Sequence, residues 1–570
     1  MKLSIEIEKR LAAFIHWGLI LITVLVADRL GTDPVNAGKM AGLTILTSCS
    51  IALIIGNFRK LAREFPVLYF MNALFLLICT LSVIFSKSPW ESGFYGEYGR
   101  NTGLLTYIGL VGLFIAVSAL RISDSHLRIL KALMIAGYLN IIYAIYFLTG
   151  RDFFSWTNPY KKFLGTFGNP DFISSFMGIF ATVIFSFILV KSMSGKFKFL
   201  LILSVVASIY VIQMTGALQG FIVTLIGLST VTGLYLYLEF KNKGVFYAYI
   251  AILMSIGVLG FFGILQKGPF VSLLYKPSVS LRGEYWQAGI NMGIHNPFLG
   301  VGLDSYGTFY RKYRDLNALT NPGTNTVTNA AHNVFIDIFA GTGFIGFFCY
   351  IAVLVFVLVT GVKEIKKVTK FDPVLVGVFS AWMAYEVQSI ISINQIGLAI
   401  WGWALGGAII SYSKIQRKGS DEYFSKNQPL KFRRDKYKDR KLQPTVIPAI
   451  KVVSILLAFA FGVLISIFPL INDYRQLKAL QKNDLKSLVS TAWTWPVDNT
   501  RLRSVSGVLL RSNDSQSFID LNLKAAKKFP SNYYFQYNLF YASRVNSPQW
   551  VGYKRILHEM DPYNPEFAPK

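Results

Sequence analysis

The chain has 570 residues, of which 53% are hydrophobic and 15% are charged, and its formal net charge is +27. Soluble domains carry about 25% charged residues. This composition and the mean hydropathy of +0.45 therefore exclude an ordinary soluble protein and indicate an integral membrane protein. Basic cytoplasmic loops account for most of the positive charge, and binding of anionic membrane lipids is compatible with it, so the charge does not indicate nucleic acid binding.

Cysteine and histidine usage indicates neither disulfides nor a metal centre. The three cysteines, Cys49, Cys79 and Cys349, all lie in apolar runs and form no Cys-x-x-Cys pair. Of the five histidines, only His295 and His332 fall in a long polar loop, where they are too isolated to suggest a metal cluster. We therefore expect no metal and no cofactor.

Thirteen apolar runs have lengths typical of membrane spans. They cover residues 11–27, 38–56, 66–85, 103–120, 129–149, 171–190, 198–214, 218–238, 245–265, 333–360, 373–392, 396–413 and 448–470. The first run has no small-residue cleavage site and is followed directly by another, so it is predicted to be a span and not a cleaved signal. The predicted fold is an all-α, polytopic transmembrane helical bundle of about 12–13 spans, with one large extracytoplasmic loop and a helical-repeat-like C-terminal domain.

Lys and Arg gather in every second loop, and the stretch from Lys414 to Lys441 is the most basic of the chain. The positive-inside rule makes these loops, and the N terminus, cytoplasmic. The opposite, extracytoplasmic side then receives residues 86–102, 150–170 and 266–331 and everything after Leu470.

The predicted organisation follows from this topology. It comprises N-terminal spans at 1–265, the large extracytoplasmic loop with the candidate catalytic motifs at 266–332, further core spans at 333–413, a basic cytoplasmic loop at 414–447, a last span at 448–470 and an extracytoplasmic tail at 471–570.

The tail contains a repeated proline motif. It reads Trp495-Pro496-Val497-Asp498, Phe529-Pro530-Ser531-Asn532 and Asp561-Pro562-Tyr563-Asn564, with the prolines 34 and 32 residues apart. A period of about 34 residues closed by proline is typical of tetratricopeptide repeats. An irregular helical domain is the alternative. Either structure predicts a role in protein interaction, such as binding an envelope protein.

The loop at 266–331 is the long one among many short ones, and its aromatic residues and Gly-Pro turns indicate function and not disorder. Two groups within it have helical spacing. They are Arg282, Tyr285, Trp286 and Gly289, and then Tyr306, Tyr310, Arg311 and Arg314. Aromatic rings with guanidinium groups suit sugar rings and phosphate oxygens. An interfacial aromatic belt with Arg reaching lipid headgroups is the alternative.

His332 stands directly before an apolar run, at the mouth of a predicted span. A lone histidine there can be a structural residue, but its side chain is also suited to accept a proton near neutral pH. Glu284 and Asp304 are rival bases in the same loop. Glu386 lies inside a predicted span, where a carboxylate is a functional candidate unless the outer interface hydrates it.

The order of several motifs resembles the O-antigen ligase/polymerase family of bacterial membrane glycosyltransferases. The motifs are Arg282-x-x-x-Trp286, Pro297 with Gly300-Val301-Gly302, His332-Asn333, Gly343 with Gly346, Gly168-Asn169-Pro170, and Gly99-Arg100 with Gly103. The resemblance covers roughly residues 90–410. Some members of the family also carry tetratricopeptide-like C-terminal regions.

The resemblance implies an enzyme of the bacterial cytoplasmic (inner) membrane that uses an undecaprenyl-diphosphate-linked glycan as donor. O-antigen ligase activity, with lipopolysaccharide core as acceptor, is the first expectation. Polymerase activity with a second lipid-linked glycan, and transfer to a protein Ser or Thr, are alternatives.

The resemblance also implies a metal-independent, inverting transfer on the outer face. Arg282 is then expected to bind the diphosphate, while His332 acts as base on the acceptor hydroxyl or helps neutralise the leaving diphosphate. The expected substrate-binding residues are Arg100, Asn169, Gln219, Trp286, Tyr306, Arg311, Arg314 and Asn333.

One position departs from the family pattern. Gln219 stands where many members carry an arginine, so phosphate binding is expected to pass to Arg100, Arg311 or Arg314. A transporter of lipid-linked glycans is the rival from another class, but it is expected to keep its polar site near the midplane, at broken helices of repeated halves. The spans show no clear repeat. A scaffold with an inactive core remains a third alternative.

The predicted topology is testable with fusions of a reporter that is active only outside the cytoplasm. Fusions at residues 300 and 520 are expected to be active, because both positions follow an odd number of spans from a cytoplasmic N terminus. A fusion at residue 368, in a predicted cytoplasmic loop, is the matched inactive control. Cytoplasmic placement of residue 300 or 520 contradicts the topology.

Overall fold

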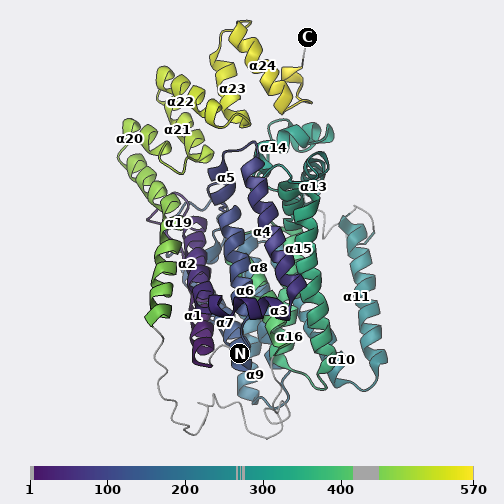
Figure 1. Ribbon diagram of the computed structural model, residues 1–570. Coiled ribbons are helices and arrows are strands. Elements are labelled where there is room, and N and C mark those ends of the chain that lie inside the picture. Colours follow the sequence, from purple (N-terminus) through teal and green to yellow (C-terminus); the bar gives the residue numbers. More distant parts are fainter. Residues whose placement is uncertain (1–4, 265–267, 270, 272–276, 415–448, 569–570) are drawn as a thin grey trace.

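The computed structural model describes residues 5–264, 268–269, 271, 277–414 and 449–568. Within these ranges the regular structure is helical and there is no strand (Figure 1). The predicted all-α class is therefore confirmed. The basic loop predicted at 414–447 lies, after Lys414, outside the described residues, as do parts of the loop that begins at 266.

Every one of the thirteen apolar runs forms a helix. These helices are α1 (Ile5–Val24), α2 (Asn36–Ile54), α4 (Pro66–Phe85), α6 (Leu104–Ser118), α7 (Ser123–Phe147), α8 (Pro170–Ile188), α9 (Gly195–Thr215), α10 (Leu218–Glu239), α11 (Lys243–Ile264), α15 (Val334–Lys367), α16 (Pro373–Ile391), α17 (Ile396–Tyr412) and α19 (Ala449–Gln481). In the described part of the chain, nine helices are long and apolar enough to cross a membrane. The chain is thus a polytopic helical membrane protein.

The spans begin where the sequence supplies capping residues. Asn169 accepts a hydrogen bond from the backbone of Asp171 at the start of α8, and Pro170 occupies the first helical position, where its missing N–H costs nothing. Asn333 caps α15 and Asp372 caps α16 in the same way. Each such cap stabilises its helix by about 1 kcal/mol.

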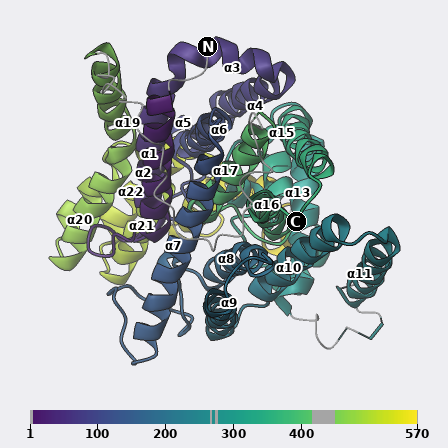
Figure 2. The same ribbon diagram turned by 90° about the horizontal axis from the view of Figure 1, so that it is seen from below.

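The centre of the bundle is formed by α6, α8, α16 and α17. Every residue of α17 from Ile396 to Ser411 is buried, and α17 packs against α6 and α16. Small residues permit this close approach, as is usual where lipid provides no hydrophobic force between helices. At Gly402, for example, a Cβ atom would lie 2.0 Å from the Tyr385 ring. Viewed from below, α19 and α11 lie on opposite sides of the bundle (Figure 2).

Helix α15 is broken near its outer end, and the loop before it closes the break. Gly343 has a φ of 68°, which interrupts the helix. The amide of Phe344 then donates to the Pro297 carbonyl at 2.7 Å, and the amide of Val301 donates to the Ala340 carbonyl at 2.8 Å. The Pro297 to Gly302 motif is therefore joined to α15 by backbone hydrogen bonds, which satisfies groups that a membrane cannot satisfy.

The helices of the tail and of the loops that were predicted to be extracytoplasmic gather at one end of the bundle (Figure 1). These loops form α5 (Trp90–Tyr95), α13 (Pro277–His295) and α14 (Tyr306–Tyr313), and we call them the outer loops. The tail forms α20 (Leu485–Ala492), α21 (Asn499–Arg511), α22 (Ser515–Lys528), α23 (Tyr533–Ala542) and α24 (Pro548–Met560), followed by the short helix η4 (Pro565–Phe567). Because α19 runs through Leu470 to Gln481, the last span and the tail share one continuous helix.

The repeated proline motif of the tail has a structural explanation. The Asp or Asn two residues after each proline caps a helix: Asp498 caps α21, Asn532 caps α23 and Asn564 caps η4. Consecutive tail helices pack against one another. The tail is thus a stack of helical hairpins, and its assignment as tetratricopeptide repeats stays a prediction.

A buried ion pair joins the tail to the outer loop. Arg314 and Asp561 are both fully buried, and the Arg314 Nη2 atom lies 2.8 Å from Asp561 Oδ2. Arg311 contacts the same carboxylate at 3.1 Å, and its guanidinium lies 4.2 Å from the centre of the Tyr533 ring. The Lys528 ammonium meets Glu91 of α5 at 3.0 Å. Loop and tail therefore lie at the same end of the molecule, as the predicted topology requires.

We expect Asp561→Asn to loosen the tail from the loop. The change leaves the buried Arg314 charge unpaired, which costs about 3–5 kcal/mol. Limited proteolysis of the purified protein should then release the tail faster than in the wild type. The matched control is Asp520→Asn, at an exposed position of α22. Equal cleavage rates for both variants contradict a holding role for Asp561.

Candidate active site

Arg282 lies on α13, which packs against α15. Its side chain is partly buried, and this burial lowers the pKa of the guanidinium. The carboxylate of Asp171, in the first turn of α8, acts on Arg282 in the opposite direction. The predicted Gly168-Asn169-Pro170 motif and the predicted loop arginine are therefore brought within electrostatic range of each other.

His332 is held in a sharp turn directly before α15. Its φ of 55° is in the left-handed region, which is uncommon for a residue other than glycine. The amide of Ala331 donates to Asp337 Oδ1 at 2.7 Å, and the Asn333 side chain accepts from the amides of Phe335 and Ile336. With both neighbours fixed, the imidazole stacks on Tyr285, with 5.9 Å between the ring centres.

The environment of His332 favours the neutral imidazole. Burial, together with the positive charges of Arg282 and Arg100, lowers its pKa to about 4. A neutral imidazole can accept a proton. An anionic ligand bound between the two guanidinium groups offsets their charge and raises the pKa of His332 again.

Arg100 is buried and tightly held. Its Nη2 atom lies 3.0 Å from Asp304 Oδ1, and its Nη1 atom donates to the carbonyl of Asn329. Burial by itself lowers the pKa of Arg100, but the carboxylates around it, Asp304 first, outweigh burial and the net shift is upward. Asp304 is fixed in turn, because its Oδ2 atom accepts from the Glu97 amide at 2.8 Å.

An aromatic cluster packs against the turn that carries His332. Tyr306 is buried, and its hydroxyl donates to the Tyr285 carbonyl. Trp286 packs against the same cluster, and its buried Nε1 atom has no hydrogen-bond partner among the described residues. The predicted aromatic wall thus exists as a packed support for His332, with Tyr306 in its interior.

Three predicted polar ligands have local partners. The Asn169 and Asn333 oxygens cap α8 and α15. Gln219 is buried between α10 and α8, where its Nε2 donates to Ser175 Oγ at 2.8 Å. Its Oε1 has no hydrogen-bond partner in the described part of the chain.

Arg311 and Arg314, which were predicted to bind substrate, contact the tail. Both guanidinium groups contact the single carboxylate of Asp561 in the tail, which offsets one of their two positive charges. Their predicted role in substrate binding stays a prediction. Glu386 lies in α16 and lines a small cavity among aromatic side chains. Glu284 is on α13, and burial raises the pKa of its carboxyl.

Asp337 was not predicted from the sequence. Its Oδ1 atom fixes the backbone just before His332. Its buried Oδ2 atom has no hydrogen-bond partner among the described residues. The signal was present, because Asp337 is an acidic residue in the first turn after the capping Asn333. Asp171 and Glu97 were also not predicted, because no spacing pattern in the sequence distinguishes them.

The fold and the site define a class: a polytopic helical membrane protein with a neutral histidine and two arginines at the mouth of a span. Residues 173–351 match the family model described as O-antigen ligase. The match reaches from α8 into α15 and includes Arg282 and His332. The match supports membership of the O-antigen ligase family, which the motifs predicted. No curated protein matches the chain.

The low pKa of His332 predicts how its reactivity depends on pH. Carbethoxylation requires neutral imidazole, so the rate at His332, followed by mass spectrometry of its peptide, should persist as the pH falls and be halved near pH 4. Arg282→Gln should move this midpoint upward, because it removes a positive charge that disfavours the imidazolium. Arg511→Gln, at an exposed position of the tail, is the control. A midpoint near the ordinary value of about 6.5 contradicts the described environment.

Proposed function

We propose that the protein is a membrane glycosyltransferase with O-antigen ligase activity. In this proposal it moves a glycan from undecaprenyl diphosphate to an acceptor on the outer face of the bacterial cytoplasmic membrane. One observation carries the proposal: a neutral histidine is fixed beside two arginines, inside the segment that matches the O-antigen ligase family. This combination offers a base and two positive charges, which are what the transfer requires.

The proposed reaction is a single displacement. The acceptor oxygen attacks the anomeric carbon, and its proton passes to the neutral ring nitrogen of His332. The bond between the anomeric carbon and the diphosphate oxygen breaks, and the configuration inverts. Arg282 binds the diphosphate and stabilises the negative charge that develops on it, with Arg100 adding to the field. Arginine side chains supply this charge in the proposal, so the transfer needs no metal ion.

The pKa of His332 suits the steps before and after the donor binds in the proposed reaction. Before the donor binds, the imidazole is neutral, because its pKa is about 4. When the diphosphate enters, its negative charge raises the pKa, so that the imidazole accepts the acceptor proton more readily. When the diphosphate leaves, the arginines again disfavour the imidazolium and the proton returns to solvent.

The position of the site favours an enzyme over a transporter. A transporter is expected to bind its substrate near the midplane of the membrane. Here His332 directly precedes α15, and Arg282 lies on an outer helix at the end where the tail also sits (Figure 1). This is the level at which a lipid diphosphate presents its glycan. The extracytoplasmic orientation of this end remains part of the proposal.

Three acceptors are proposed, ranked by the resemblance to the family. Lipopolysaccharide core comes first, and a second lipid-linked glycan or a protein hydroxyl are the alternatives. The tail offers a helical surface for an acceptor or an envelope protein. Deleting the gene and comparing lipopolysaccharide, free polymer length and glycoprotein staining distinguishes the three acceptors.

The mechanism is tested by a transfer assay with purified protein, lipid-linked glycan and acceptor. His332→Gln should lower kcat about 100- to 10,000-fold, the usual contribution of a general base, and Arg282→Gln should lower kcat/KM for the donor. The matched control is His295→Gln. His295 is on the same helix as Arg282 but is exposed, and its side chain contacts the Asn291 carbonyl. Wild-type rates for the first two variants overturn the mechanism.

A further inference from the structure

An aromatic cluster joins three segments of the chain at the outer end of the bundle. Trp90, the first residue of α5, and Trp495, in the turn between α20 and α21, have ring centres 6.2 Å apart. The Trp495 ring centre also lies 5.1 Å from that of Phe468 in α19 and 6.0 Å from that of Tyr95 in α5. We call these four residues the outer aromatic cluster.

The level of this cluster follows from two spans, α4 and α19, which are both long and apolar enough to cross a membrane. Trp90 is the first residue of the helix that follows α4, which ends at Phe85. In α19, no charged residue stands between Lys451 and Asp473, and Phe468 lies at the outer end of this apolar stretch. The cluster therefore lies where both spans leave the hydrocarbon region of the membrane.

A proline in α19 explains how α5 is attached at this level. Pro469 has no backbone N–H, so the carbonyl of Ile465, four residues earlier, lacks its usual donor in the helix. The Tyr95 hydroxyl donates to this carbonyl at 3.0 Å. Because an unpaired carbonyl is costly in the hydrocarbon region, this hydrogen bond holds α5 against the outermost part of the span.

The two tryptophan side chains are exposed beside the ends of the spans. Trp90 is 50% exposed and Trp495 is 44% exposed, and Phe85 at the end of α4 is 70% exposed. Tryptophan favours the interface between a membrane and water, because its ring is apolar and its N–H is polar. Exposed indole rings at the end of two spans are therefore in the position where phospholipid covers them.

Asn472 of α19 fixes the turn that carries Trp495. Its buried side chain donates from Nδ2 to the Trp495 carbonyl at 2.7 Å and to the Thr494 carbonyl at 3.4 Å. The next residue, Asp473, accepts from the Thr32 amide at 2.9 Å. Trp495 is thus attached through its backbone to α19, and its ring keeps one depth relative to this span.

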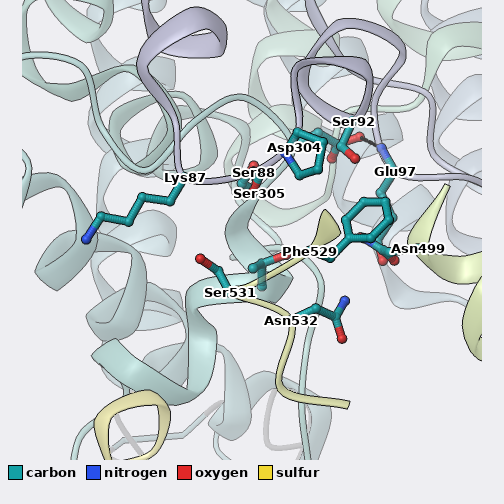
Figure 3. Close-up of a pocket in the computed structure, with 12 residues that line it drawn as sticks. Lys87, Ser88, Ser92, Glu97, Asp304, Ser305, Asn499, Phe529, Ser531 and Asn532 are labelled. Carbon is teal, nitrogen blue, oxygen red and sulfur yellow. Dashed lines mark hydrogen bonds between the residues drawn. The ribbon is translucent and has the colours of Figure 1, made fainter. Parts of the chain in front are cut away.

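The rest of the tail is held against the outer loop that carries Trp90. Lys528 of the tail pairs with Glu91 of α5 at 3.0 Å. Figure 3 shows Asn499 and Phe529 of the tail beside Glu97 of this loop, where they line one small pocket. A fixed depth of the outer aromatic cluster in the membrane therefore also fixes the height of the tail above it.

We propose that Trp90 and Trp495 insert into the interface of the bilayer at the outer end of the bundle, and that phospholipid is the partner of the outer aromatic cluster. The indole rings lie at the level of the glycerol and carbonyl groups of the phospholipid. They anchor the tail at the membrane surface. This inference goes beyond the proposed glycan transfer and does not depend on it.

Depth-dependent fluorescence quenching tests this placement. The full-length protein is reconstituted into phosphatidylcholine vesicles whose lipid carries bromine either near the start of its acyl chains or near their ends. The emission of the pair is the difference between the wild type and the Trp90→Phe, Trp495→Phe double variant. Lipid brominated near the start of the chains should remove about half or more of this emission, and lipid brominated near the chain ends should remove less, because indole rings reside at the interface.

Two further measurements control the experiment. Trp550 lies on α24, the last long helix of the tail, where it stacks on Phe540 with 5.0 Å between ring centres. In Figure 1, α24 lies at the end of the tail far from the spans. The emission lost in Trp550→Phe should resist both brominated lipids. Each single variant, Trp90→Phe or Trp495→Phe, gives the emission of one ring where the double variant does not fold.

The outcomes are distinct. Emission of the pair that resists both brominated lipids overturns the proposal. If aqueous iodide then quenches the pair, the cluster faces water, and if iodide also fails, another protein or a second copy of the chain covers it. Stronger quenching by bromine at the chain ends contradicts the proposal as well, since it places the rings in the hydrocarbon region.

Discussion

The structure depends on how the outer end of α15 satisfies its backbone. Near a membrane, each unpaired backbone group costs several kcal/mol, and α15 has such groups at its first turn and at the break at Gly343. Asn333 accepts from the first-turn amides of Phe335 and Ile336, and Asp337 accepts from the Ala331 amide just before the helix. The Pro297 loop satisfies the break. These hydrogen bonds fix the turn that carries His332 and, at the same time, attach the outer loop to the membrane domain. The position of the candidate site is therefore set by the hydrogen bonds at the start of α15.

The arginines near the candidate site differ in how their charges are paired. Buried charges need partners, and the structure provides them unequally. Arg314 shares the carboxylate of Asp561 with Arg311 and holds the tail. Arg100 is compensated by Asp304 but still acts on His332. At Arg282 the effect of burial outweighs the field of Asp171, so the pKa of the guanidinium is lowered. In the proposed function, the diphosphate of the donor supplies the negative charge that this arginine and the neutral His332 attract.

The sequence predicted the membrane architecture well because hydrophobic length and capping residues are local properties. Every apolar run became a helix, and the polar residues that precede α8, α15 and α16 became caps. The site was predicted less completely. Helical spacing correctly put Tyr310, Arg311 and Arg314 near one another, but the partner of Arg314 lies 247 residues later in the chain, and no local pattern reveals it. Asn169 and Asn333 cap helices in the structure, and their predicted substrate binding stays a prediction.

The match to the O-antigen ligase family ends at residue 351, before the tail begins, yet buried contacts hold the tail against the matched segment. Asp561 of the tail pairs with Arg314, and Lys528 of the tail pairs with Glu91. The charge that acts on His332 is fixed in another way, because Arg100 pairs with Asp304 and Asp304 accepts from the backbone amide of Glu97. The tail and the candidate site therefore share one end of the molecule, but the Arg100–Asp304 pair is held by the loops alone.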